Sequence, residues 1–252
     1  MTGKDGGMER AALVTGAATG IGLATAERLL RDGFALAYHS HREDERARAR
    51  FEELAGLGRA VWVVGDLAEA GTPERIVRET LEGLGRLDAL VNNAGVVRPK
   101  PALELTAEDF DAVFAVDVKA AFLLSVAAAP ELRRSGDGAI VNITSVHEHA
   151  PRPGLALYAA AKAALGMLTR SLALELAPEI RVNAVAPGAI ATERNEEADE
   201  LSGESPLGRP GTAAEVAGAV SWLVGEDARY VSGASIVVDG GMLQQVVERP
   251  AE

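Results

Sequence analysis

Short apolar runs alternate with longer amphipathic stretches along almost the whole chain. Such alternation is typical of β-α-β units, in which each strand of a parallel sheet is followed by a helix that packs back on the sheet. Most of the runs lack polar alternation, as expected for strands that helices cover on both faces. Strands are expected over residues 11–15, 34–38, 60–64, 89–91, 139–143, 181–186 and 235–238. The pattern predicts an α/β fold with a doubly wound, seven-stranded parallel sheet and ligands at the carboxyl ends of its strands.

The stretches between the expected strands carry helix start and stop signals. The signals for a helix N-terminus are Thr72 followed by Pro73, Thr106 with Asp109, and Thr212 with Glu215. Gly33 and Gly83 fit caps at helix C-termini. These intervals are therefore expected to be helical.

The charge and composition of the chain exclude several classes of function. Its 252 residues include 25 basic and 37 acidic ones, which gives a net charge of -12. This charge would repel the phosphate backbone of nucleic acids, so we expect no nucleic-acid partner. The absence of cysteine removes disulfides, zinc–thiolate sites and thiolate catalysis, and no metal site is expected.

The chain reads as one domain. No linker or change in composition divides it, so we expect a single domain over residues 11–252 behind a flexible polar tail at 1–10. The tail has no apolar stretch of the kind that a secretory signal needs. The longest apolar run, residues 120–130, contains Ser125 and is much shorter than the roughly 20 residues that cross a bilayer. We therefore expect a cytoplasmic protein with no membrane partner.

A glycine-rich segment follows the first expected strand and opens an amphipathic helix. It reads Thr15-Gly16-Ala17-Ala18-Thr19-Gly20-Ile21-Gly22. Glycines let the backbone turn sharply and approach a pyrophosphate, and a helix N-terminus offers unpaired N–H groups with a positive dipole end. In this first β-α turn the segment predicts a dinucleotide site. The expected contacts are Gly16, Ala18, Thr19, Gly20, Ile21 and Gly22.

Tyr158 and Lys162 are four residues apart within an expected helix. Four residues correspond to slightly more than one helical turn, so both side chains lie on one face. A cation about 4 Å from a phenol, at an effective dielectric constant of about 20, stabilises the phenolate by about 4 kcal/mol. Lys162 is thus sufficient to activate Tyr158 for proton transfer. Standing alone, the pair would be better explained as a chance feature of an amphipathic helix.

The pair does not stand alone. Three motifs follow one another along the chain: the spacing Gly-x-x-x-Gly-x-Gly, the run Asn92-Asn93-Ala94-Gly95, and Tyr158-x-x-x-Lys162. In this order they resemble the motifs of the short-chain dehydrogenase/reductase family. The resemblance extends from about residue 11 to residue 242. The resemblance implies a Rossmann-type fold, a nicotinamide cofactor, a small alcohol or carbonyl substrate, and a homotetramer packed through long helices.

The resemblance also implies roles for individual residues. Ser145 would hydrogen-bond the substrate oxygen, Tyr158 would exchange the proton, and Lys162 would also hold the nicotinamide ribose. The family usually places an asparagine on the long helix after Asn-Asn-Ala-Gly, where this chain has Asp117. A carboxylate there would hold the relay water and add negative charge near Lys162, which favours the cation but weakens its effect on the tyrosine. We expect a shifted pH optimum.

Further cofactor contacts follow from the same resemblance. Asp66 and Leu67, after the third strand, would meet the adenine. The turn after the fourth strand and the turn after the sixth would approach the nicotinamide side of the cofactor. Their expected contacts are Asn93, Ala94, Gly95, Pro187, Gly188, Ile190 and Thr192. The polar stretch over residues 190–209 reads either as a substrate lid or as a disordered loop.

The end of the second strand bears on the choice between NAD and NADP. An acidic residue there normally binds the ribose 2′-hydroxyl of NAD, but the chain reads Tyr38-His39-Ser40-His41-Arg42. We interpret His39 and Ser40 as donors for a 2′-phosphate, with a plain polar loop as the equal alternative. Thr19 stands where the NADP enzymes of the family often carry arginine. NADP is favoured, and NAD remains open.

The substrate is the least constrained feature. Within the family the likeness is to bacterial glucose 1-dehydrogenases, through Ser145-Val146-His147-Glu148, the prolines at 151 and 153, and Asp239-Gly240-Gly241-Met242. His147 and Glu148 would then face a sugar, or else form a salt-linked loop. The alternatives are a 3-oxoacyl-carrier-protein reductase, whose acidic partner would need a basic patch such as Arg133-Arg134, and a dinucleotide sensor without catalysis.

Overall fold

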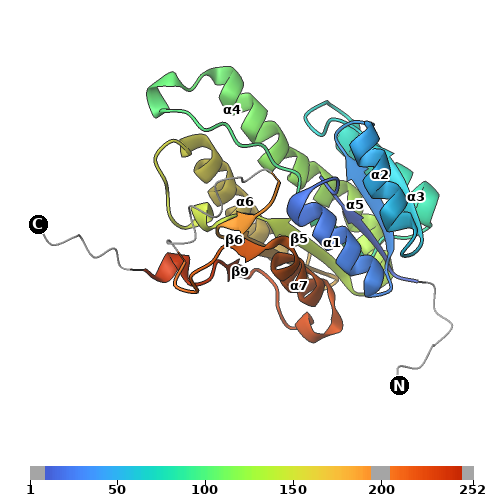
Figure 1. Cartoon of the computed structure of the whole chain (residues 1–252). Coiled ribbons are helices and arrows are strands. Elements are labelled where there is room, and N and C mark those ends of the chain that lie inside the picture. The colour runs from blue at the N-terminus through green and yellow to red at the C-terminus, as the bar shows by residue number, and fades with distance from the viewer. Residues whose placement is uncertain (1–8, 194–204, 246–252) are drawn as a thin grey trace, which may run out of the picture.

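The computed structural model describes residues 9–193 and 205–245, and these form a three-layered α/β domain (Figure 1). A parallel sheet of seven strands, in the order β3-β2-β1-β4-β5-β6-β9, lies between two layers of helices. The strands are β1 Ala11–Val14, β2 Ala35–Ser40, β3 Ala60–Val64, β4 Ala89–Asn92, β5 Gly138–Ile143, β6 Ile180–Pro187 and β9 Ser235–Val238. The predicted seven-stranded Rossmann-type sheet is confirmed. Of the expected tail only Glu9 and Arg10 lie within the described residues, and much of the expected lid lies outside them.

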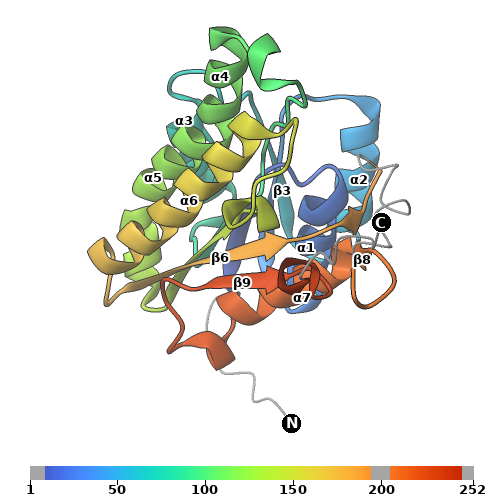
Figure 2. The ribbon, with the colours of Figure 1, turned by 90° about the vertical axis from the view of Figure 1, so that its left-hand side faces the viewer.

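The helices divide between the two faces of the sheet, as Figure 2 shows. The longer ones are α1 Gly20–Arg31, α2 Glu45–Ala55, α3 Thr72–Leu84, α4 Ala107–Phe114, α5 Ala121–Ser135, α6 Ala156–Glu175 and α7 Ala213–Val224. Between α4 and α5 the backbone is a π-helix, η2 Ala115–Ala120. Short 3-10 turns are η1 Ala102–Glu104, η3 Val146–Glu148, η6 Glu226–Ala228 and η7 Met242–Gln244, and a separate two-stranded sheet pairs β7 Ile190–Ala191 with β8 Gly211–Thr212.

The two helical layers enclose two hydrophobic cores, one on each face of the sheet. One core holds Leu29 of α1 and Leu223 of α7, and the other holds Ile76 of α3 and Leu124 of α5, all of them fully buried or nearly so. Successive strand residues point to opposite faces, which is why the strands need apolar residues at almost every position. The cores fix the positions of the strand ends, where the polar loops gather.

Helix capping follows the sequence signals in most places. Thr106 and Thr212 each form a capping box with an acidic residue three positions later, and Gly33 has the left-handed φ of +88° expected after α1. The assignment of Gly83 as a cap is wrong, because Gly83 lies inside α3, which ends at Gly85 with φ +78°. A Cβ at Gly83 would lie 2.8 Å from Val61 Cγ1, so this glycine lets α3 approach β3.

One continuous helical run in the described part of the chain, Ala107–Ser135, is long and apolar enough to cross a membrane by length and composition alone. Its α5 portion packs against β4, β5 and α3. Buried residues such as Leu124 and Leu132 account for much of its apolar character, since they face the core. The run is therefore a core helix of this domain whose outer face is also apolar.

Candidate active site

The glycine-rich segment lies at the carboxyl ends of β1 and β4, where the strand order reverses, which is where proteins of this fold bind a dinucleotide in a crevice. Gly16 and Gly20 have φ values of +63° and +55°, which side-chain-bearing residues rarely adopt. A Cβ at Gly22 would overlap the carbonyl oxygen of Gly16. The N-cap residue Thr19 makes no side-chain cap, and the first turn of α1 has no acidic residue. The N-terminus of α1 is thus suited to a pyrophosphate.

Asn93 joins the turn after β4 to this glycine-rich segment. Its Nδ2 donates to the carbonyl oxygens of Thr15 (2.8 Å) and Gly16 (3.1 Å). In return, the Thr15 hydroxyl oxygen accepts from the backbone N–H groups of Asn93 (2.9 Å) and Ala94 (3.0 Å). Four hydrogen bonds therefore lock the two turns together. The Asn93 side chain therefore fixes the turn after β4 against the glycine-rich segment.

His39 and Ser40 do not present the free donors that the sequence analysis expected. Nδ1 of His39 accepts from the N–H of Gly16 at 3.1 Å, and Nε2 donates to the carbonyl oxygen of Gly65 at 3.1 Å. Burial lowers the pKa of His39 to about 4, so the ring is neutral at neutral pH. The Ser40 hydroxyl is bound by the indole N–H of Trp62 and donates to a backbone carbonyl. The hydrogen-bonding groups of His39 and Ser40 are thus already used by partners within the protein.

The remaining expected cofactor residues line the same edge of the sheet. The carboxylate of Asp66 accepts from a backbone N–H two residues later and is partly exposed, whereas Leu67 is buried in the core. On the other side, Thr192 lies against the segment, because a Cβ at Gly20 would be 3.4 Å from Thr192 Cγ2. A Cβ at Gly188 would lie 2.7 Å from Asp239 Cβ, so that turn needs glycine.

Tyr158, Lys162 and Asp117 come together, with Gly95 of the turn after β4 lying against Asp117 and Lys162. Lys162 Nζ lies 5.5 Å from the centroid of the Tyr158 ring and 3.0 Å from Asp117 Oδ2. It also donates to the carbonyl oxygen of Ile143, the last residue of β5, at 3.1 Å. The other Asp117 oxygen accepts from the N–H of Val96 at 2.7 Å. Asp117 lies in the π-helix η2, a helix distortion often found at functional sites.

The ion pair between Lys162 and Asp117 is buried. The exposed fractions of the two side chains are 4% and 0%. Burial alone lowers the pKa of Lys162, but the charge of Asp117 and the neighbouring Tyr158 together outweigh it, so the pKa of Lys162 lies above its usual value. The lysine is therefore a permanent cation beside the phenol.

Ser145 and His147 lie in the turn after β5, and His147 contacts Tyr158. The Ser145 residue is 7% exposed, and its hydroxyl oxygen accepts from the N–H of His147 at 3.2 Å. The rings of His147 and Tyr158 meet edge to face, with centroids 6.1 Å apart. Nδ1 of His147 lies 2.9 Å from the carbonyl oxygen of Ala150, which places the ring proton on Nδ1 and leaves Nε2 as an acceptor.

Glu148 does not face this pocket, which corrects the expectation of a substrate contact. Its side chain is 2% exposed and lies against α6 and β9. Arg170 is 3.4 Å away, and the Ser235 hydroxyl donates to the carboxylate at 3.0 Å. Glu148 is therefore part of a salt-linked loop, which was the alternative to a substrate contact.

A buried polar chain beneath the site was missed by the sequence analysis. Asn92 Nδ2 donates to Asn142 Oδ1 at 2.8 Å, and Asn142 Nδ2 donates to the Thr169 hydroxyl at 2.8 Å. These bonds tie β4, β5 and α6 together directly below Lys162. The signal was an asparagine at or next to the last position of two otherwise apolar strands. Over residues 9–193 and 205–245, no three His, Asp or Glu side chains gather as a metal site would need.

Known proteins resemble the chain over nearly its whole length. Residues 16–243 match the family model described as enoyl-(acyl carrier protein) reductase. A glucose 1-dehydrogenase of Gluconobacter oxydans is 38% identical over 91% of this chain and 90% of its own. An acetoin dehydrogenase structure from Salmonella typhimurium is 39% identical, with a TM-score of 0.89 over 97% of this chain and 100% of that one. A short-chain dehydrogenase from Burkholderia cenocepacia in complex with NADP is 37% identical, with a TM-score of 0.87 over 93% and 98%.

Proposed function

Because the chain belongs to the short-chain dehydrogenase/reductase family and is an NAD(P)-dependent oxidoreductase, we propose that it interconverts a small alcohol and its carbonyl, with a sugar such as glucose as the first candidate. The observation that supports this proposal is that Lys162 lies beside Tyr158 and bonds to Ile143, two residues before Ser145, whose hydroxyl accepts from the N–H of His147 beside the tyrosine. A non-catalytic dinucleotide sensor would have no use for this complete set.

The proposed mechanism divides the reaction between the residues and the cofactor. In oxidation, the Tyr158 phenolate accepts the hydroxyl proton of the alcohol while the Ser145 hydroxyl donates a hydrogen bond to the same oxygen. The Lys162 ammonium stabilises the phenolate by its charge, and its link to Ile143 holds it in place. The bound nicotinamide supplies the hydride acceptor in oxidation and the donor in reduction.

His147 supports a substrate with a second oxygen beside the reacting carbon. Its Nε2 is available to accept a hydrogen bond, and its ring lies against Tyr158. Glucose carries a hydroxyl on the carbon next to C1, and acetoin carries a hydroxyl on the carbon next to its carbonyl, so in each case a hydroxyl beside the reacting carbon can donate to Nε2. The two relatives are named for these two compounds, which share that arrangement. We therefore infer a sugar or a small hydroxyketone as the substrate.

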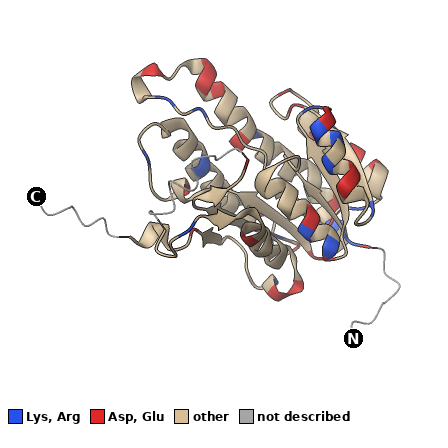
Figure 3. Cartoon of the chain, viewed as in Figure 1, with Lys and Arg blue, Asp and Glu red and all other residues tan. Residues whose placement is uncertain are grey.

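The carrier-protein alternative is less well supported by the position of its basic patch. Arg133 and Arg134 lie near the end of α5, just before β5 begins, whereas Ser145 follows the other end of β5. Six strand residues span about 20 Å. Arg134 is also paired with Glu131 at 2.9 Å. Figure 3 shows acidic and basic residues interspersed on α1 and α2 rather than a basic surface.

The substrate proposal is tested by comparing kcat/KM for glucose, acetoin and an acetoacetyl thioester with each nicotinamide cofactor. We expect glucose or acetoin to be turned over with kcat/KM at least about tenfold above the thioester, a difference worth roughly 1.4 kcal/mol. Preference for the thioester would instead favour the 3-oxoacyl reductase.

We infer that NADP is the preferred cofactor, with Arg42 in place of His39 and Ser40 as the donor for the 2′-phosphate. Arg42 lies two residues after the end of β2, its side chain is 78% exposed, and its Nε is 3.3 Å from Asp44 Oδ2, which leaves its other guanidinium donors for the phosphate. The Ser40 hydroxyl donates to its carbonyl oxygen at 2.9 Å. Arg42→Ala is expected to weaken NADPH binding about tenfold and to leave NADH binding nearly unchanged, since a hydrogen bond to a charged group contributes about 1.5–3 kcal/mol. Fluorescence titration measures both, with Arg78→Ala on α3 as the control. Tighter binding of NADH by the parent protein would overturn the inference.

Asp117→Asn is expected to move the pH–rate profile of alcohol oxidation toward lower pH. Loss of the carboxylate leaves the field of the Lys162 ammonium less opposed at Tyr158, so the phenolate is present at lower pH. The measurement is kcat/KM across the neutral and alkaline range. Profiles that superimpose would show that the Asp117 charge does not reach the tyrosine.

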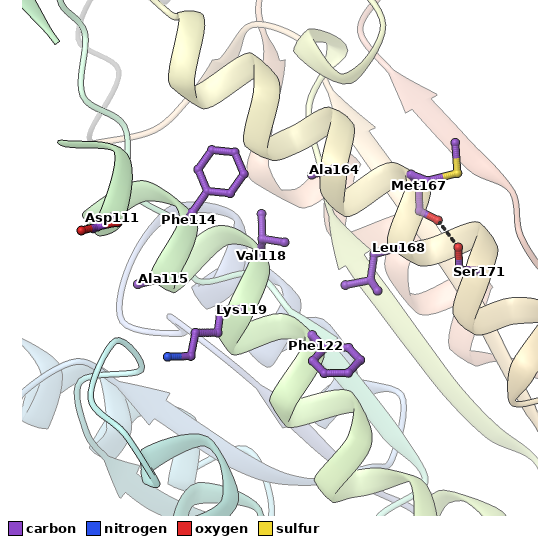
Figure 4. Close-up of a pocket in the computed structure, with 10 residues that line it drawn as sticks. All are labelled: Asp111, Phe114, Ala115, Val118, Lys119, Phe122, Ala164, Met167, Leu168 and Ser171. Atoms are coloured by element: carbon purple, nitrogen blue, oxygen red, sulfur yellow. Dashed lines mark hydrogen bonds between the residues drawn. The ribbon is translucent and has the colours of Figure 1, made fainter. Parts of the chain in front are cut away.

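We also propose that the protein is a homotetramer packed through α5 and α6. A groove of about 670 Å³ lies between α6 and the helical run formed by α4, η2 and the start of α5, and Figure 4 shows Phe114, Phe122, Met167 and Leu168 along it. Met167 is 57% exposed and Phe122 is 41% exposed. A second copy of the chain would cover this apolar face. Sedimentation of the parent as a tetramer and of Met167→Asp as a smaller species is expected, whereas a monomeric parent would contradict the proposal.

A further inference from the structure

Glu148 is a buried carboxylate that the proposed chemistry does not use. It ends the turn η3, three residues after Ser145, and its N–H donates to the Ser145 carbonyl oxygen at 2.8 Å. The same turn carries His147. Any movement of Glu148 would therefore be transmitted to both residues of the pocket that come from this turn.

The Glu148 carboxylate occupies a notch in α6 that exists because residue 166 is glycine. A Cβ at Gly166 would overlap Oε1 and Cδ of Glu148 and lie 2.8 Å from its Cγ. A glycine inside a helix is less stable than an alanine at the same position, so its presence here needs a packing reason. Gly166 lies one turn beyond Lys162 and two turns beyond Tyr158 on the same face of α6. The notch and the phenol thus belong to one rigid helix.

Two further contacts fix the carboxylate in the notch. The Ser235 hydroxyl of β9 donates to Oε2 at 3.0 Å, and Arg170, one turn beyond Gly166, lies 3.4 Å from Oε1. His149 lies 3.8 Å from Oε2. One side chain therefore connects the turn η3, the helix α6 and the strand β9.

We propose that Glu148 is a positioning residue: seated in the Gly166 notch, it sets the separation between Ser145 and His147 on η3 and Tyr158 on α6. This inference rests on the proposed roles of those three residues. Reacting groups must be held within a fraction of an ångström, and a misplacement of about 1 Å costs about 10²-fold in rate. The contact acts through geometry and touches neither substrate nor cofactor.

The test is a double-mutant cycle of Glu148→Ala, Gly166→Ala and the two combined. Each single change is expected to lower kcat at least about tenfold with little change in NADPH affinity, because each displaces η3 without touching the cofactor crevice. In the Glu148→Ala background the methyl at position 166 has room, so Gly166→Ala should cost almost nothing further. Glu148→Gln should keep most of the activity, since the amide fills the notch and still accepts from Ser235.

Gly218→Ala on α7 is the matched control, because a Cβ there meets only Arg28 Nη1 at 3.7 Å. It should leave kcat unchanged. Costs that add in the double variant, or a Gly166→Ala variant as active as the parent, would overturn the inference. The unfolding free energies of the parent, Glu148→Ala, Gly166→Ala and the double variant give a second cycle that needs no substrate. If the parent reduces and oxidises nothing, the proposed function fails, and the unfolding cycle still decides whether Glu148 and Gly166 are coupled.

Discussion

Tyr158→Phe is expected to lower kcat/KM by about 10²–10⁴-fold, the contribution typical of a general acid–base group. The phenol is the one group that the proposed mechanism uses to exchange a proton with the substrate oxygen. Phenylalanine keeps the ring that meets His147 edge to face, so the pocket should keep its shape. The measurement is the initial rate of nicotinamide absorbance change with the best substrate of the screen.

Two control measurements accompany this variant. NADPH affinity and the unfolding midpoint should stay close to those of the parent, because the lost hydroxyl takes no part in the hydrogen bonds that shape the glycine-lined crevice. A Tyr158→Phe protein that reduces ketones as fast as the parent would eliminate Tyr158 as the proton-transferring residue.

Lys162→Met is expected to abolish measurable turnover and to destabilise the fold by about 3–5 kcal/mol. The change removes the cation from a fully buried pair and leaves the Asp117 carboxylate without it. Urea unfolding measures the free energy, and Arg78→Met on α3, where the side chain is 63% exposed, serves as the control. The combined Lys162→Met and Asp117→Asn change should recover much of the stability and none of the turnover.

The pH dependence of the pair sets the conditions for that measurement. The pKa of Lys162 is raised in the folded protein above its ordinary value of 10.5. The stabilisation is therefore fully present below that value and is lost only as the pH rises through the higher folded value. Neutral and mildly alkaline assays keep the pair intact. A Lys162→Met protein as stable as the parent near neutral pH would show that the ion pair contributes nothing net.

The sequence predicted the parts of the fold that depend on local pattern. Residues 60–64 and 235–238 were expected as strands and are β3 and β9 residue for residue, because short apolar runs between helical stretches leave little choice. The four-residue spacing of Tyr158 and Lys162 predicted that both side chains lie on one face of a helix, because four residues make slightly more than one helical turn. Gly83 was expected to cap α3, but the cap is Gly85, two positions later, and Gly83 packs against Val61. The local pattern does not distinguish a capping glycine from a packing glycine.

What the sequence did not predict is where polar side chains find their partners. His39 was interpreted as a phosphate donor, but its ring bonds to Gly16 and Gly65, which come from two other turns. Glu148 was left open between a pocket contact and a salt-linked loop, and its partners on α6 and β9, which are distant in sequence, decide for the second. A polar residue at a strand end satisfies either a ligand or a neighbouring turn, and only the packed structure distinguishes them.

Deuterium transfer is the most direct test of the oxidoreductase chemistry at this site. The protein is incubated with reduced cofactor deuterated at C4 and a panel of sugar lactones, hydroxyketones and simple ketones, and the products are examined by mass spectrometry. The expected result is one deuterium on the carbon that bears the new hydroxyl of at least one product. Tight cofactor binding with no deuterium in any product would contradict hydride transfer and leave a dinucleotide-binding protein without catalysis.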